Sequence, residues 1–135
     1  MMRNALLLSL LLSPQAFATA LPVTWSLAGE WRVHDANDPA FDGVSASSAD
    51  WRTLRVPANW YSDGLDHQGA LWYRHSFTLP EQSADTLATL VFDGVDYLAD
   101  VTLNGQRLAH HEGYYQRFPV DISQALRRHN QLTVR

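Results

Sequence analysis

The sequence predicts an all-β protein, folded as a two-layer antiparallel β-sandwich of either the jelly-roll or the immunoglobulin-like kind. From Trp31 onward, short runs of alternating apolar and polar residues follow one another, and this period of two is that of a half-buried strand. Turn-forming residues separate the runs at intervals of roughly eight to twelve positions, a spacing typical of sandwiches and barrels. No segment carries an apolar stripe of helical period longer than two turns, which argues against a layer of helices.

The size and composition of the chain are those of one folded domain. It has 135 residues and a mass of 15.2 kDa, with 46% hydrophobic and 18% charged residues, which excludes a disordered chain. All the basic residues are Arg, and the formal net charge is -4, so we expect no nucleic-acid partner. The absence of Cys excludes a disulfide framework, a thiolate nucleophile and a Cys-containing zinc site.

The N-terminal segment has the features of a secretory signal peptide. Arg3 supplies a positive charge, residues 5–12 are largely apolar, and Ala-x-Ala sites end at Ala18 and Ala20. Residues 1–20 are therefore predicted to be a signal peptide cleaved after residue 18 or 20, which leaves a secreted or periplasmic domain at 21–135. The apolar stretch is far shorter than the roughly 20 residues that cross a bilayer as a helix, so we expect no membrane association after cleavage.

The first well-defined strand is expected over residues 71–79, where every second residue from Leu71 is apolar or aromatic and points to one buried face. Pro80 ends this run because proline cannot donate to a β-ladder. If Phe77 is buried as the alternation predicts, Phe77→Ala costs roughly 3 to 5 kcal/mol. A second strand is expected over residues 87–92.

A third strand is expected over residues 97–104, with Tyr97, Ala99, Val101 and Leu103 on its buried face. Asn104-Gly105 follows directly, and this pair is typical of a type I′ hairpin turn because both residues tolerate a positive φ. The next strand, residues 106–110, is therefore expected to pair antiparallel with the third.

The last part of the chain contains two further strands. Phe118, Val120 and Ile122 alternate with polar residues or proline, and Asp121 or Ser123 is expected to cap a single helical turn over residues 124–127. A final strand begins near Leu132. The chain stops within this strand pattern, so we expect a domain that is incomplete at its C-terminus.

No catalytic residue is predicted. Hydrolysis of a glycosidic bond requires a pair of carboxylates, and the predicted mature chain contains three Glu residues, Glu30, Glu81 and Glu112. Glu30 and Glu81 lie beside turn residues and are expected to be solvated. Glu112 lies in the segment His-His-Glu-Gly-Tyr-Tyr, where it is expected to pair with an Arg or to accept hydrogen bonds from backbone N–H groups.

No metal site and no cofactor are predicted. His110 and His111 are adjacent on a strand, so their side chains point to opposite faces and cannot bind one ion together. His75 falls on the apolar face of its strand and is expected to be a hydrogen-bonded core residue.

The aromatic residues point to carbohydrate as the partner. An aromatic ring offers a flat apolar surface that suits the C–H face of a pyranose, while polar neighbours bind the hydroxyls. Trp31, Trp51 and Trp72 are expected in the core. For a second group, core and binding roles are equally plausible: Trp60, Tyr61, Tyr114 and Tyr115.

Several linked motifs resemble one known family. They are Val-Pro-Ala-Asn-Trp at 56–60, Gly-Ala-Leu-Trp-Tyr-Arg at 69–74, Phe-Asp-Gly-Val-Asp-Tyr at 92–97 and His-Glu-Gly-Tyr-Tyr at 111–115. In this order they resemble the N-terminal sugar-binding domain of glycoside hydrolase family 2, over about residues 31–135.

The resemblance implies a jelly-roll, galactose-binding-like β-sandwich that forms the N-terminal domain of a retaining exo-β-glycosidase. In complete family members an immunoglobulin-like domain and a TIM barrel follow, and the barrel carries both catalytic Glu residues. The chain would then be inactive alone, with the C-terminal domains of the same enzyme as its partners. By the family motif Asn59 lies near the terminal β-linked sugar, and Trp60 beside it is the second predicted substrate-binding residue.

The resemblance leaves two questions open. The sequences of residues 94–97 and 111–114 resemble those of β-mannosidases and β-glucuronidases more closely, whereas the sequence of residues 57–60 is closer to that of β-galactosidases. The motifs therefore do not identify the sugar. The alternative function is a free-standing secreted carbohydrate-binding module of the same fold.

Overall fold

The computed structural model of the protein describes residues 21–47, 51–81 and 86–135. The predicted signal peptide, residues 1–20, lies outside the described residues. The described residues contain no helix with the length and apolarity that a membrane span requires.

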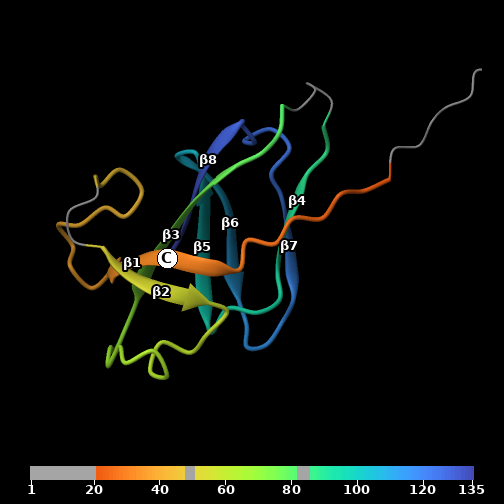
Figure 1. Ribbon diagram of the computed structural model, residues 1–135. Coiled ribbons are helices and arrows are strands. Elements are labelled where there is room, and N and C mark those ends of the chain that lie inside the picture. The colour runs from red at the N-terminus through yellow and green to blue at the C-terminus, as the bar shows by residue number, and fades with distance from the viewer. Residues whose placement is uncertain (1–20, 48–50, 82–85) are drawn as a thin grey trace, which may run out of the picture.

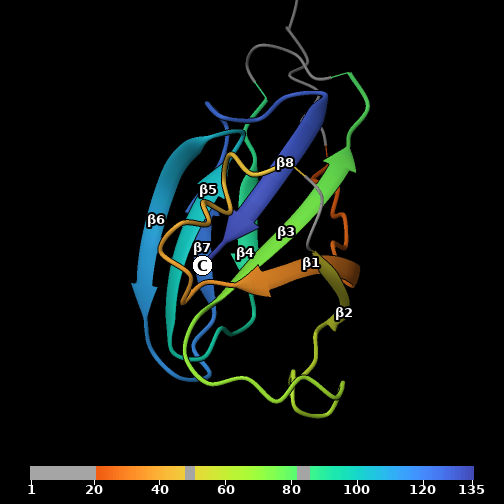
Figure 2. The same ribbon diagram turned by 90° about the vertical axis from the view of Figure 1, so that its left-hand side faces the viewer.

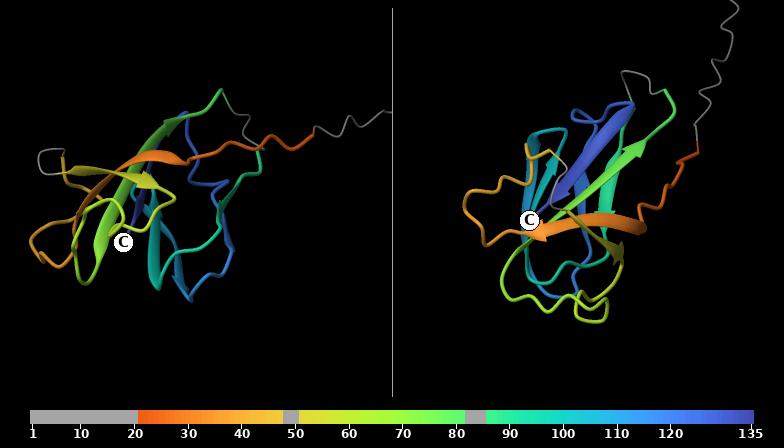
Figure 3. Two further views of the ribbon diagram at one scale, coloured as in Figure 1. Left: turned by 60° about the horizontal axis from the view of Figure 1, so that its bottom comes forward. Right: turned by 60° about the vertical axis from the view of Figure 1, so that its left-hand side comes forward.

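The described residues form eight strands in two antiparallel sheets (Figure 1). The larger sheet has the order β2-β1-β3-β8-β5-β6, and the smaller one pairs β4 with β7. Figure 2 shows the smaller sheet behind the larger, and Figure 3 shows the two layers from other sides. The predicted all-β, antiparallel sandwich is confirmed. In chain order the strands are β1 (Gly29–Asp35), β2 (Arg52–Val56), β3 (Leu71–Thr78), β4 (Thr89–Phe92), β5 (Leu98–Leu103), β6 (Gln106–Glu112), β7 (Phe118–Asp121) and β8 (His129–Val134).

The core lies between the two sheets and is built by alternation along the strands. The inward-facing residues of β5 and β8 are the most deeply buried of this cluster, β7 covers them from the smaller sheet, and Trp31 closes the core from β1. Val101, Leu103 and Leu132 are fully buried. The principal members of the cluster are Trp31, Ala99, Val101, Leu103, Phe118, Val120, Ile122, Ala125, Leu132 and Val134.

Strand β3 corrects one expectation. Phe77 packs against the core but is only partly buried, and along β3 only Leu71 is buried. Tyr73 and Trp72 are also partly buried. The full cost of removing a buried ring therefore does not apply to Phe77.

The β5–β6 hairpin is confirmed. Asn104 and Gly105 have φ values of 53° and 84°, as the two central residues of a type I′ turn require. Strand β6 continues to Glu112, two residues beyond the predicted end, since Leu98 pairs with Glu112 at the far end of the ladder.

The segment between β7 and β8 contains the predicted single turn, which is not continued into a helix. Ala125 and Leu126 both donate backbone hydrogen bonds to the carbonyl of Ile122, at 3.0 and 2.9 Å. Asp121 accepts from the Ser123 backbone N–H at 2.9 Å, so it caps an isolated turn.

Strand β8 lies in the middle of the larger sheet. It pairs antiparallel with β3 from His129 to Val134 on one side and with β5 on the other. The ladder continues through Arg135, whose backbone N–H and C=O both bond to Asp100, at 3.0 and 2.9 Å. The last strand is therefore not the unpaired edge of this sheet.

Candidate functional site

Asn59 lies in the loop of residues 57–70, which connects β2 to β3. A cis peptide bond between Val56 and Pro57 begins this loop. The side-chain Oδ1 of Asn59 accepts a hydrogen bond from the Tyr61 backbone N–H at 3.0 Å, and its carbonyl accepts from the Ser62 N–H at 2.9 Å. Asn59 thus forms a local Asx turn. Its side chain is exposed, and its Nδ2 group has no hydrogen-bond partner among residues 21–47, 51–81 and 86–135.

Trp60 is partly buried within the same loop. Its ring centroid lies 6.0 Å from that of Tyr61 and 6.4 Å from that of His67. Its indole Nε1 is buried and unpaired within the part of the chain that the structure describes. In this conformation the indole N–H is therefore not available to a ligand, and Trp60 offers only ring surface.

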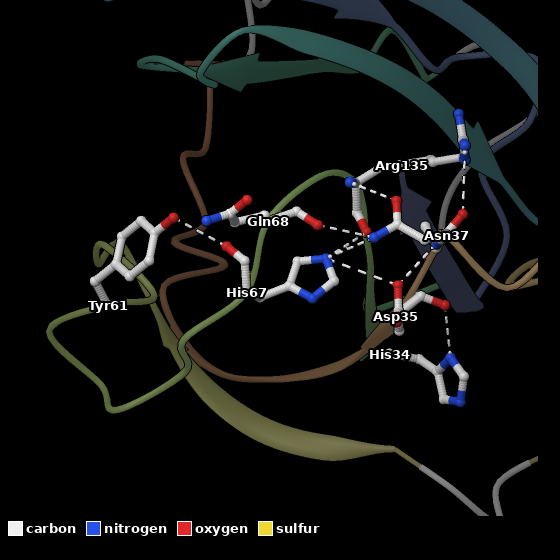
Figure 4. A network of polar contacts seen from close by, with 9 residues as sticks. His34, Asp35, Asn37, Tyr61, His67, Gln68 and Arg135 are labelled. Atoms are coloured by element: carbon white, nitrogen blue, oxygen red, sulfur yellow. Dashed lines mark hydrogen bonds and ion pairs between the residues drawn. The ribbon is translucent and has the colours of Figure 1, made fainter.

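A network of polar contacts holds the end of this loop against β1 (Figure 4). Asn37 follows β1, and its side chain bridges to the loop: Nδ2 donates to the Gln68 carbonyl at 2.8 Å, and Oδ1 accepts from the Ala70 N–H at 3.2 Å. His67 lies beside it, with its Nε2 3.0 Å from the Ala70 carbonyl and 3.7 Å from Asp35. The Tyr61 hydroxyl donates to the His67 carbonyl at 3.0 Å. The network fixes the loop that carries Asn59 and Trp60.

Gly69 explains how closely the two segments approach. A Cβ atom at this position would lie 2.4 Å from Asn37 Oδ1, and the φ of Gly69 is +104°. A side chain would therefore clash with the Asn37 carboxamide and strain the backbone. The position requires glycine if the Asn37 bridge is to form.

An open depression of about 280 Å³ lies beside the loop, against β1 and β2. It is lined by Glu30, Thr53, Leu54, Arg55 and Asp63. Asp63 belongs to the loop and accepts from the Arg55 backbone N–H at 3.4 Å. Asn59 and Trp60 do not line this depression, so the structure places the two predicted residues on one turn but not in a closed cavity.

A second group of aromatic residues lies on two other loops, residues 93–97 between β4 and β5 and residues 113–117 between β6 and β7. Tyr97 and Tyr114 have ring centroids 4.5 Å apart. The Tyr97 hydroxyl donates a hydrogen bond to the Glu112 carboxylate, and this bond is the main reason that the pKa of Tyr97 is raised. We call Tyr97, Tyr114 and Tyr115 the tyrosine cluster.

This cluster corrects two expectations. Tyr97 is not on the buried face of β5 but lies before the strand and is 38% exposed. Glu112 pairs with the Tyr97 hydroxyl and not with an Arg or a backbone N–H, because the β5–β6 register sets it opposite the start of β5. The contact spans fifteen residues of sequence, and local spacing gave no signal for it.

The adjacent histidines His110 and His111 point to opposite faces as predicted, whereas His75 is hydrogen-bonded but only partly buried. His110 lies on the outer surface, where its Nδ1 is 2.9 Å from Asp100 Oδ1. The His111 ring instead stacks on Phe118, with ring centroids 3.8 Å apart, so the two side chains point to opposite faces. The His75 ring stacks on Trp31 with ring centroids 4.9 Å apart, and its Nδ1 lies 3.2 Å from the Glu30 carbonyl oxygen. In the described ranges, no three His, Asp or Glu side chains lie close enough together to hold a metal ion.

The three tryptophans predicted for the core divide into two groups. Trp31 is buried, with 6% exposure. Trp51 and Trp72 are only partly buried. The Arg74 guanidinium lies over the Trp51 ring, 4.4 Å from its centroid, and donates to the Gly43 and Ala46 carbonyls. Arg74 therefore attaches the segment after β1, together with Trp51, to β3.

Comparison with known proteins gives a consistent picture. Residues 65–135 match the profile of the glycosyl hydrolase 2 galactose-binding domain-like family. A β-glucuronidase of Formosa agariphila is 25% identical over 118 residues, which are 77% of this chain and 12% of the relative. The β-galactosidase BoGH2A of Bacteroides ovatus is 30% identical over 113 residues, covering 73% of this chain and 13% of the relative.

Solved structures agree with the sequence relatives. The β-glucuronidase of Bifidobacterium dentium, complexed with coumarin-3-O-glucuronide, has a TM-score of 0.68 and 30% identity, covering 80% of this chain and 19% of that one. The β-glucuronidase of Faecalibacterium prausnitzii has a TM-score of 0.70 and 30% identity, covering 85% and 22%. The chain thus spans only about a fifth of either structure and a smaller share of the curated relatives.

Proposed function

Because the chain belongs to glycoside hydrolase family 2, we propose that it is the N-terminal carbohydrate-binding domain of a secreted or periplasmic, retaining exo-β-glycosidase. The observation that supports this most directly is the match of residues 65–135 to the galactose-binding-like domain of that family. The relatives named above are a β-glucuronidase and a β-galactosidase, and the chain covers 12% and 13% of their lengths.

In this function the chain contributes binding and not bond cleavage. Retaining hydrolysis needs two carboxyl groups about 5 to 5.5 Å apart, one as nucleophile and one as acid and base. Glu30 lies in β1, Glu81 follows β3, and Glu112 ends β6 and is engaged by Tyr97. We assign none of the three a catalytic role.

Asn59 and Trp60 are the residues proposed to contact the terminal β-linked sugar. The exposed Nδ2 of Asn59 can donate to a sugar hydroxyl while its Oδ1 remains engaged by the Tyr61 N–H. The Trp60 ring supplies an apolar surface beside it. Since the Asn37 network holds the loop, little conformational entropy is lost when a sugar binds.

The test removes the Nδ2 donor of Asn59 while keeping the Asx turn that Asn59 forms with the Tyr61 N–H. Asn59→Asp keeps an oxygen that can cap the Tyr61 N–H but removes the Nδ2 donor. In the intact enzyme we expect kcat/KM on nitrophenyl β-glycosides to fall about tenfold, the loss of one hydrogen bond in binding. Ser62→Ala, an exposed change on the same turn, is the matched control and should leave kcat/KM unchanged.

Three results would contradict the proposal. Unchanged kcat/KM in Asn59→Asp on every aryl β-glycoside removes the assigned contact. Turnover of a nitrophenyl glycoside by residues 21–135 alone contradicts the non-catalytic role. A stop codon directly after residue 135 would favour the free-standing module, whereas a reading frame that continues into a catalytic domain supports the enzyme.

Export has a separate test. N-terminal sequencing of the mature protein should begin at residue 19 or 21. An uncleaved N-terminus in a cytoplasmic fraction would contradict a secreted or periplasmic location.

A further inference from the structure

The tyrosine cluster is the clearest unassigned feature of the surface. It lies on the loops of residues 93–97 and 113–117, which sit at the lower end of the sandwich in Figures 1 and 2. Three bulky rings are exposed here: Tyr97 by 38%, Tyr114 by 58% and Tyr115 by 90%. Nothing in the core requires them, because the fully buried residues belong to other positions of the strands.

The two loops that carry the cluster are tied together. The Gly113 backbone N–H donates to the Tyr97 carbonyl at 2.9 Å. Arg117 and Asp93 form an ion pair at 3.3 Å. A Cβ atom on Gly94 would lie 3.6 Å from Tyr115 Cα, so the backbones are nearly in contact. The rings are therefore mounted on a joined pair of loops.

The ring positions are also set in advance. Tyr97 is held by its hydroxyl bond to Glu112 and by its ring contact with Tyr114, whose plane is inclined by 31°. Tyr115 has a φ of 53°, a left-handed conformation that is uncommon for a residue with a bulky side chain. Strained backbone of this kind concentrates at binding sites. A ligand would meet a surface that needs little reordering.

The charges around the rings indicate which ligand would bind. Asp93, Asp96 and Glu112 are acidic, and the one cation of these loops, Arg117, is already paired with Asp93. A carboxylate ligand would be repelled here. A hydroxyl can instead donate to the Glu112 carboxylate, which has acceptor capacity beyond the Tyr97 bond.

We propose that the tyrosine cluster is a saccharide-binding site in which the Tyr114 ring, backed by the Tyr97 ring, stacks against the C–H face of a neutral pyranose and Glu112 accepts from its hydroxyls. The inference deepens the proposed function and rests on it. It adds a second contact surface, since no hydrogen bond or ring contact joins these loops to residues 57–70 in the described parts of the chain. It also selects neutral sugars over uronates at this surface.

The experiment measures binding of three probes to the intact protein by NMR titration: methyl β-D-galactopyranoside, methyl β-D-glucopyranoside and methyl β-D-glucuronide. We expect at least one neutral probe to shift the tyrosine ring signals and to bind more tightly than the glucuronide. Tyr114→Ala should weaken that binding about fivefold to tenfold. Tyr114→Phe keeps the ring and should stay within about twofold of the native protein.

Further variants separate the contributions. Glu112→Gln keeps the shape but removes the charge, so it should reduce the preference for neutral over uronate probes. Thermal unfolding of each variant checks that the fold is intact. If Tyr114→Ala does not fold, Tyr97→Ala removes the ring that backs Tyr114 and should also weaken binding of the neutral probe.

The outcomes distinguish this inference from the proposed function. If Asn59→Asp lowers kcat/KM while the tyrosine variants bind neutral sugars like the native protein, the inference fails and the proposed function stands. Tighter binding of the glucuronide than of the neutral probes also overturns the inference. So does the absence of binding to any probe, including the case where Tyr114→Ala alters only association with a protein partner.

Discussion

Asn130 shows how a single buried polar residue organises the chain before the last strand. It is 4% exposed, yet its carboxamide is engaged on both sides. Its Oδ1 accepts from the Arg127 backbone N–H at 2.8 Å and from Asn104 Nδ2 at 2.9 Å, and its Nδ2 donates to the Arg127 carbonyl at 2.6 Å. One side chain thus joins the turn before β8 to the β5–β6 hairpin.

Replacing Asn130 should therefore be costly. Asn130→Ala leaves the Arg127 N–H and carbonyl without their partner at a partly buried position, and we expect a loss of about 1 to 3 kcal/mol in the free energy of unfolding. Urea denaturation measures it. His129→Ala, an exposed neighbour, is the control and should change stability by less than about 0.5 kcal/mol. Equal effects of the two would contradict the role given to Asn130.

At the scale of elements, the Asn104-Gly105 turn sets the register of β5 and β6 next to the turn, as far as the register shift between Val101 and Thr102. Gly105 has a φ of +84° and open space around its Cα, so Gly105→Ala isolates the backbone cost. We expect a loss of about 1 to 2 kcal/mol in unfolding free energy, since a residue with a Cβ is disfavoured in this region. Gln106→Ala, exposed on the same hairpin, should change it by less than about 0.5 kcal/mol. A neutral Gly105→Ala would mean that the turn is not held in this conformation.

The elements that sequence predicts well are those with local causes. The hairpin follows from the conformational freedom of Asn104 and Gly105, and β7 follows from the alternation of Phe118 and Val120, even though Pro119 lies between them. Pro119 is tolerated because β7 pairs only with β4 in the described residues. The length of β6 is less predictable, since its end depends on what lies opposite.

The elements that sequence does not predict depend on contacts between distant residues. The order of the strands places β8 between β3 and β5, and no local pattern encodes that neighbourhood. The same holds for the Asn37 bridge to Gln68 and for the Tyr97 bond to Glu112. Only the sequence motif at residues 56–60 indicates a role for Asn59 and Trp60, and that role remains a prediction.

For the whole molecule, stability depends on the core shared by β5, β7 and β8. Leu132 has no exposed surface, so Leu132→Ala should cost about 2 to 5 kcal/mol in unfolding free energy. Phe77→Ala removes a larger side chain, but from a partly solvated position, and we expect a smaller loss than for Leu132→Ala. Urea denaturation of both variants gives the comparison. A greater loss in Phe77→Ala would show that the partly exposed ring matters more than the central leucine.

The central place of β8 has a consequence for how the protein forms during synthesis. On one side of β8 stand β2, β1 and β3, and on the other β5 and β6. While residues 129–134 are still inside the ribosome, the nascent chain can form the three-stranded part β2-β1-β3 and the β5–β6 hairpin, but these two parts cannot yet be joined into one sheet. The larger sheet can be completed only after translation of these residues, and until then the edges of β3 and β5 that β8 will cover remain open to chaperones or to other nascent chains.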